Sequence, residues 1–144
     1  MFEPIGAVCN HEQVLYGLRY ATVARRLGKI DPFHEEGGYW LRDSGEQQVL
    51  RCFIIPRGVA LIAGGTVTPT ATSFTLVAEA GSDTCGICSN RFLDKEFKTV
   101  RYELTVTMLD ANRFHYKEDS QLRMPGRPDL FHHTDGNTLT RVTA

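Results

Sequence analysis

Long apolar runs are missing from this sequence, and so is any strong excess of charge. No apolar segment approaches the ~20 residues that a membrane-spanning helix requires. The 16 basic side chains nearly balance 17 acidic ones, which leaves a formal charge of -1. A nucleic-acid-binding domain usually carries a basic footprint, and anionic membrane surfaces favour the same property. The composition therefore predicts a globular protein that binds no nucleic acid and inserts into no membrane.

Cysteine is scarce, with 4 in 144 residues. A chain of this length buries enough apolar surface to fold without disulfides, and we expect residues 1–144 to form a single domain. The opening residues MFEP lack the basic segment and the following apolar segment of a secretory signal. Together these features predict a reduced, cytoplasmic setting.

Helical periodicity is rare, whereas alternation of apolar and polar residues is frequent. Runs rich in β-branched and aromatic residues, separated by turn signals, predict strands. The expected strands are residues 13–23, 39–41, 48–55, 59–63, 66–68, 73–80, 84–89, 99–109, 113–122 and 138–143. Gly64-Gly65 predicts a tight bend, and residues 90–97 predict a short helix with Asn90 as its N-cap. Residues 23–30 fit either a helical turn or a strand end.

The strand at 99–109 shows the clearest two-residue period. Its apolar face holds Val100, Tyr102, Leu104, Val106 and Met108, and its polar face holds Arg101, Glu103, Thr105 and Thr107. Long strands with a polar face favour a barrel whose interior, lined by Thr, Arg and Glu, contains water or a ligand. A sandwich with the polar faces outside is the alternative that alternation alone does not exclude.

Two short motifs resemble metal or redox sites. Cys85 and Cys88 have the spacing of a thioredoxin motif or of half a zinc site, but the flanking residues predict strands and no second cysteine pair follows. Core cysteines are the favoured interpretation.

His34-Glu35-Glu36 lacks a second histidine four residues after the first, because position 38 is glycine. A strand with charges on both faces, one facing the interior, is expected there instead of a metalloprotease site.

The densest polar cluster is FHHTDGNTL at residues 131–139. Adjacent histidines on a strand point to opposite faces, so one of His132 and His133 would face the interior and could bind a haem iron or a polar ligand head. The alternative is a turn in which Thr134, Asp135 and Asn137 bond the backbone before the last strand. No nucleophile elbow, phosphate loop or carboxylate pair is evident, and the sequence therefore nominates no catalytic residues.

Several blocks resemble one family in the same order along nearly the whole chain. They are PFHEEGGYW (32–40), IPRGVALIAGGT (55–66), GICSNRFLDKEFKTVRYELTVT (86–107) and FHHTDGNTLTRV (131–142). They are similar to bacterial fatty-acid-binding-protein-like proteins, which are grouped with the nitrobindins as THAP4-like haem-binding β-barrels. The resemblance implies an all-β, antiparallel calycin-type barrel of the lipocalin and FABP kind, with about ten strands and a short helix near the barrel mouth.

The resemblance also implies ligand-binding residues. In nitrobindins a histidine near the C-terminus ligates ferric haem, and His133, just before the last expected strand, is the nearest match, with His132 as the other candidate. In the fatty-acid carriers an interior arginine and tyrosine hold a carboxylate, for which Arg101 and Tyr116 are chemically suited. Trp40, in the PFHEEGGYW block, completes the expected set.

The leading functional hypothesis is an intracellular barrel that binds a small hydrophobic or amphipathic, fatty-acid-like ligand without catalysis. The alternatives are a ferric-haem protein with nitrobindin-like peroxynitrite isomerase activity, the one enzymatic reading, and a non-catalytic interaction module. Family members usually open with a Gly-x-Trp strand, which this sequence lacks. Either the first strand of the barrel is missing or another segment covers that edge. An exposed edge invites pairing with a second chain, which predicts a homodimer.

Overall fold

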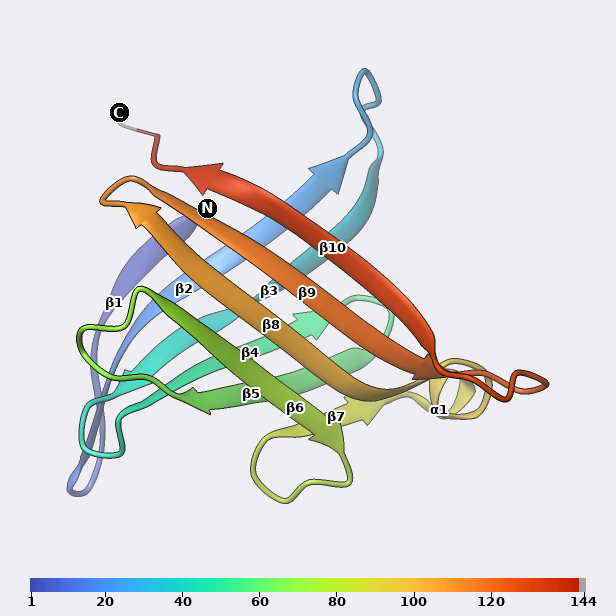
Figure 1. Ribbon diagram of the computed structural model, residues 1–144, viewed down its shortest axis with the longest axis horizontal. Coiled ribbons are helices and arrows are strands. Elements are labelled where there is room, and N and C mark those ends of the chain that lie inside the picture. The colour runs from blue at the N-terminus through green and yellow to red at the C-terminus, as the bar shows by residue number, and fades with distance from the viewer. Residues whose placement is uncertain (143–144) are drawn as a thin grey trace.

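The computed structural model describes residues 1–142 and contains ten strands and one short helix (Figure 1). The strands are β1 (Phe2–Asn10), β2 (Gln13–Arg25), β3 (Pro32–Asp43), β4 (Gln48–Ile55), β5 (Val59–Thr66), β6 (Ser73–Ala80), β7 (Gly86–Ser89), β8 (Lys98–Asp110), β9 (Arg113–Arg123) and β10 (Phe131–Thr140), and the helix is α1 (Arg91–Glu96). No helix in this part of the chain is both long and apolar enough to cross a bilayer.

All ten strands form one sheet in the order β1-β2-β3-β4-β5-β7-β6-β8-β9-β10. Every pairing is antiparallel except the short one between β6 and β7. The sheet curls until β8, β9 and β10 lie across from β1, β2 and β3 (Figure 1). Within the described residues β1 and β10 do not pair with each other, so the sheet is a calycin-like barrel that stays open along one side. The expected all-β barrel architecture is thereby confirmed.

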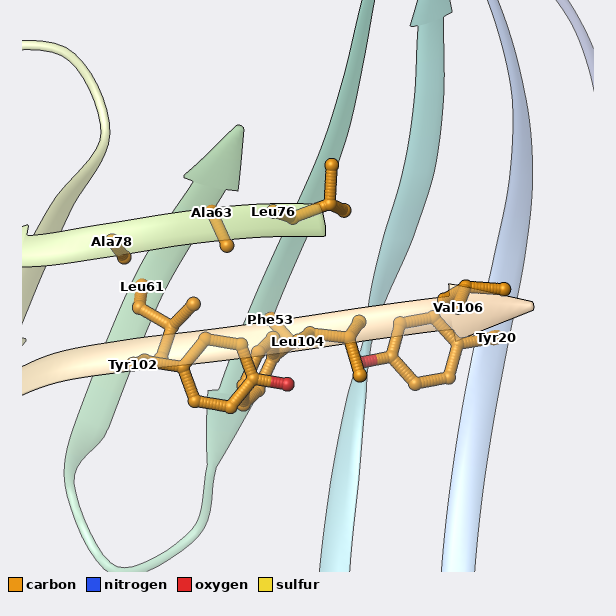
Figure 2. Close-up of a cluster of buried hydrophobic side chains, with 9 residues drawn as sticks. All are labelled: Tyr20, Phe53, Leu61, Ala63, Leu76, Ala78, Tyr102, Leu104 and Val106. Atoms are coloured by element: carbon orange, nitrogen blue, oxygen red, sulfur yellow. The ribbon is translucent and has the colours of Figure 1, made fainter. Parts of the chain in front are cut away.

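The core lies on the concave face of the curled sheet, and its residues alternate along each strand. On β8, Tyr102, Leu104 and Val106 are buried, while the residues between them are only half-buried. Figure 2 shows this core, which consists of Tyr20, Phe53, Leu61, Ala63, Leu76, Ala78, Tyr102, Leu104 and Val106. The expectation that the Arg, Glu and Thr face of β8 lines the interior is therefore wrong. Alternation defines the two faces of the strand but not which of them is buried. The apolar face of β8 is the buried one, because removing apolar area from water is favourable.

Several local predictions are confirmed. Asn90 caps α1 by accepting a hydrogen bond from the Leu93 amide at 2.9 Å. Asp43 ends β3 and accepts bonds from the amides of Gly45 and Glu46 in the turn that follows. Strand β4 has the bounds that the sequence predicts. These successes share a cause, because caps and turns depend on side chains that are close in sequence.

Three local predictions are corrected. The structure contains a strand, β1, that is not among the strands expected from the sequence. Strand β5 continues through Gly64-Gly65 without a bend, and glycine is required there for close approach, because a Cβ at Gly65 would lie 2.2 Å from the carbonyl oxygen of Thr75. The polar cluster at 131–139 is strand, not turn, since β10 pairs with β9 along its whole length. Thr143, the end of the last expected strand, lies outside the described residues.

Candidate functional site

The register of β8, β9 and β10 defines which side chains face the interior. Residues directly opposite each other in neighbouring antiparallel strands share a face. The three rows that start from buried residues of β8 are Tyr102–Ser120–His133, Leu104–Glu118–Asp135 and Val106–Tyr116–Asn137. Because the β8 member of each row belongs to the core, the β9 and β10 members lie on the interior face as well.

Arg51, on β4, is a buried cation at the centre of this interior. Its Nε donates to the hydroxyl of Tyr20 at 3.1 Å, and its Nη1 donates to the hydroxyl of Tyr102 and to Oε2 of Glu118 at 3.2 Å. Its Nη2 donates to Oε1 of Glu36. These five residues, from β2, β3, β4, β8 and β9, are called the Arg51 cluster below. They bridge walls of the barrel that face each other.

Aromatic rings surround the Arg51 guanidinium. Its Cζ lies 4.5 Å from the ring centre of Phe53 and between 5.4 and 5.9 Å from those of Tyr20, Trp40 and Tyr102. At such distances a cation is attracted to the negative face of a ring. Figure 2 shows the hydroxyl ends of Tyr20 and Tyr102 turned toward the space between facing strands. The interior is thus apolar with one polar centre.

Burial and charge set the protonation of this centre. Burial raises the pKa of the Tyr20 and Tyr102 phenols well above their ordinary value, so both hydroxyls stay protonated. Burial alone would lower the pKa of Arg51, but the surrounding tyrosine oxygens and carboxylates outweigh it and raise that pKa. The guanidinium therefore remains charged, and with Glu36 and Glu118 it gives the Arg51 cluster a formal charge of -1.

Three of the five expected site residues lie on the interior face. His133 shares a row with Tyr102, and Tyr116 donates its hydroxyl to Oδ2 of Asp135 at 2.9 Å. Burial, and then this bond, raise the pKa of Tyr116. Trp40 packs against the core, and its Nε1 is buried without a hydrogen-bond partner among residues 1–142.

The structure does not bring Arg101 and His132 to this interior. Arg101 lies on the outward face of β8, where it pairs with Glu79 and with Glu103 at 2.9 Å. The Nδ1 of His132 lies 2.7 Å from Oδ2 of Asp119, on the face opposite to His133. The expectation that the two adjacent histidines face opposite sides is confirmed, and His133 is the inward one.

Sequence reasoning missed the Arg51 cluster except for one hint. The sequence predicted that one charged residue of the strand at 34–36 faces the interior, without naming it, and in the structure Glu36 does so. Arg51 carried a signal that was not used, because it is the single charge in the apolar strand QVLRCFII, two residues from Val49 and from Phe53. A cation at the same period as buried neighbours must face the interior and needs a partner there.

Two hollows adjoin the sheet. One, of about 740 Å3, lies along β2, β3, β4, β5 and β7. Most of its lining residues, such as Tyr39, Ile54 and Ile62, point outward, and the core residues Tyr20, Phe53 and Leu61 also border it. The other, of about 660 Å3, lies along β8, β9 and β10 and is bordered by Glu118 and Asp135 together with outward residues such as Lys117. Both volumes fall in the range of small-molecule sites, roughly 300–1,000 Å3.

The cysteines do not form a metal or disulfide site. All four are unpaired; Cys9 and Cys88 are exposed, and Cys52 and Cys85 are partly exposed, so the expectation of core cysteines is wrong. No group of three or more His, Cys, Asp or Glu side chains suited to a metal ion occurs in residues 1–142. Cys88 lies on the four-residue β7 and Cys85 directly precedes that strand, so neither thiol is at the start of a helix, as a thioredoxin-like motif would require.

Comparison with known proteins agrees with this architecture. No curated protein matches the sequence. Among solved structures, the crystal structure of Rv2717c from M. tuberculosis superimposes with a TM-score of 0.62 at 20% identity, covering 90% of this chain and 81% of that one. That likeness supports the fold. The sequence profile of the THAP4-like, heme-binding beta-barrel domain family matches residues 2–141. The chain therefore belongs to this family of THAP4-like β-barrel domains.

Proposed function

We propose that this protein binds a small hydrophobic or amphipathic ligand inside the barrel, against the aromatic residues that surround Arg51. The single observation that supports this most is Trp40. Its indole N–H is buried in the interior and has no acceptor among the described residues, although a buried donor without a partner costs about 1–3 kcal/mol. An oxygen of a bound molecule would satisfy it.

A further feature supports a ligand in this place. Leu18 lies directly opposite Trp40 on the interior face and is 38% exposed. Apolar surface that faces a barrel interior and is not covered by the protein's own side chains is available to a ligand.

The test uses Trp40 as the probe, since it is the only tryptophan. We expect the neutral dye N-phenyl-1-naphthylamine to bind with one-to-one saturation and to quench Trp40 emission by energy transfer. Leu18→Arg places a charge beside Trp40 and should weaken binding at least tenfold. Thr138→Arg adds the same charge at an exposed, outward position of β10 and should leave binding unchanged. Absence of saturable binding to the wild-type protein would refute the proposal.

Haem is a second candidate, because the family is described as haem-binding. The residues fit a haem at the open side of the barrel: His133 presents an imidazole on the interior face of the exposed edge strand β10, beside Phe131. They do not fit one at the centre, which the Arg51 cluster bridges from wall to wall. A bound haem would supply an iron with an open position for a small molecule.

The two adjacent histidines offer a matched test of haem binding. Titration with haemin should produce a Soret band that His133→Ala abolishes and that His132→Ala, on the opposite face, retains. An equal loss in both variants would show that His133 is not the ligand. A wild-type protein with no Soret shift would end the haem hypothesis, while the dye experiment would still decide on ligand binding.

The open side also supports the predicted self-association. Strands β1 and β10 each present one edge that pairs with no other strand among residues 1–142, and unpaired edges favour pairing with another chain. We therefore propose a homodimer. Light scattering at high protein concentration should give twice the mass of one chain, and a monomer under those conditions would refute the dimer.

A further inference from the structure

The Arg51 guanidinium keeps only one of its five N–H groups free, so it has no free pair to offer an anionic ligand. Four hydrogen bonds engage it, two to tyrosine hydroxyls and two to the carboxylates of Glu36 and Glu118. A buried arginine that binds a ligand carboxylate usually does so with a pair of free N–H groups. Here the protein's own glutamates occupy that position. A carboxylate entering the interior would have to displace one of them.

The charge of the interior opposes an anion as well. Arg51 contributes one positive charge, and Glu36 and Glu118 contribute two negative ones. Asp135 lies directly opposite Glu118 on β10, on the same face, and adds a third carboxylate. Asp135 is exposed, but Glu36 and Glu118 are largely buried, where like charges repel more strongly than in water. A ligand with a negatively charged head therefore meets net repulsion wherever it approaches the Arg51 cluster.

Two unused hydrogen-bonding atoms around the same guanidinium indicate the polar group that would fit. The Trp40 N–H needs an acceptor. Oε2 of Glu118 accepts from both Arg51 and Tyr102, which leaves Oε1, on a side chain that is 22% exposed, free to accept from a ligand. A hydroxyl group both accepts and donates. It can accept from the Trp40 indole and donate to Oε1 of Glu118 without adding charge, whereas an ammonium group cannot accept from the indole.

We propose that the ligand is an uncharged amphiphile with a hydroxyl head, such as a long-chain alcohol, and that the barrel selects against carboxylates of the same length. This inference rests on the proposed ligand-binding function and specifies its chemical class. The indole of Trp40 and the carboxylate of Glu118 hold the hydroxyl, and the apolar chain lies against the partly exposed interior residues.

The test compares decanol, decanoate and decylamine as competitors of bound N-phenyl-1-naphthylamine at pH 7. Decanol should displace the dye at a concentration at least tenfold lower than either charged analogue. Decanoate or decylamine binding as tightly as decanol would overturn the proposal, as would failure of all three to displace a dye that does bind. If the dye itself does not bind, ligand binding as a whole is refuted, which keeps the two failures distinct.

Three variants locate the selectivity. Glu118→Gln makes the Arg51 cluster formally neutral and should raise decanoate affinity about tenfold or more. Glu103→Gln removes a carboxylate from the outward Arg101 pair and should change nothing. Trp40→Phe should lower the affinity for decanol several-fold and leave the affinity for decanoate unchanged. Because this variant lacks the tryptophan donor, displacement is measured from the emission of the directly excited dye. Should Glu118→Gln fail to fold, as judged by circular dichroism, Glu36→Gln removes the same charge from the other side.

Discussion

Two arginines of this barrel hold two carboxylates each, on opposite faces of the sheet. Arg51 faces the interior with Glu36 and Glu118, and Arg101 faces outward with Glu79 and Glu103. Side-chain exposure separates them, at 9% for Arg51 and 33% for Arg101. The outer group, Arg101 with its carboxylates, exchanges hydration for ion pairs of similar strength. The inner group, Arg51 with its carboxylates, is largely removed from water, so its charges depend on one another for stabilisation.

The largest expected effect comes from removing the inner cation. Arg51→Ala leaves Glu36 and Glu118 without their counter-charge in the interior, which should lower the free energy of unfolding by about 3–5 kcal/mol. Urea denaturation followed by circular dichroism measures this. A loss below about 1 kcal/mol would show that water reaches the cluster freely, and the inner and outer groups would then be equivalent.

A smaller change tests a single hydroxyl of the inner group. Tyr102 donates to Glu118 at 2.8 Å and accepts from Arg51, so Tyr102→Phe removes two bonds to charged groups. We expect a loss of about 1.5–3 kcal/mol in the same denaturation experiment. Tyr39→Phe, at a more exposed phenol, is the control and should be neutral. Equal effects in both variants would contradict the proposed importance of the buried bond.

Alkaline pH should distinguish the buried phenols from the rest. The pKa values of Tyr20, Tyr102 and Tyr116 are raised by burial above the ordinary value of 10.0. Because a group with a raised pKa stabilises the folded state fully below its unfolded pKa, this stability is lost as pH rises from about 10 toward the folded values. Phenolate absorbance should increase in the folded protein for fewer than the five tyrosines. Ionisation of all five before unfolding would contradict the burial.

The smallest effect should come from the outer group. Arg101→Ala should lower the free energy of unfolding by no more than about 1 kcal/mol. Its effect should shrink further as salt is added, because exposed charges are screened. Melting temperature measured at low and high ionic strength checks this. A salt-independent loss comparable to that of Arg51→Ala would remove the distinction between the two faces.

The same comparison explains how far the sequence predicted the molecule. Alternation and turn signals predict β4, β8 and α1 closely, because these features depend on neighbouring residues. Alternation also predicts which residues of β8 share a face, but not which face is inside. That choice depends on contacts across the interior, such as those of Tyr102 on β8 with Phe53 and Arg51 on β4.

The candidate site was harder to predict than the fold. Arg51 lies 15 and 67 positions from its two carboxylate partners, Glu36 and Glu118, so no local pattern joins them. Of the residues named from the resemblance, His133 and Trp40 lie on the interior face. Arg101 and Tyr116 were both selected for their chemistry, and Tyr116 lies on the interior face whereas Arg101 lies outside. A residue type indicates what chemistry is available, and only the register of the strands decides where it is available.

The unpaired edges have a mechanical consequence. In a closed barrel, widening the wall breaks backbone hydrogen bonds. Here the first and last strands share none, and Phe2 of β1 meets Phe114 of β9 through an edge-on ring contact with 6.4 Å between the ring centres. Separating two rings requires far less work than breaking the row of backbone hydrogen bonds between two paired strands. The open side of the barrel can therefore widen by bending of the sheet alone. A guest molecule would then enter from the side, with every strand still folded.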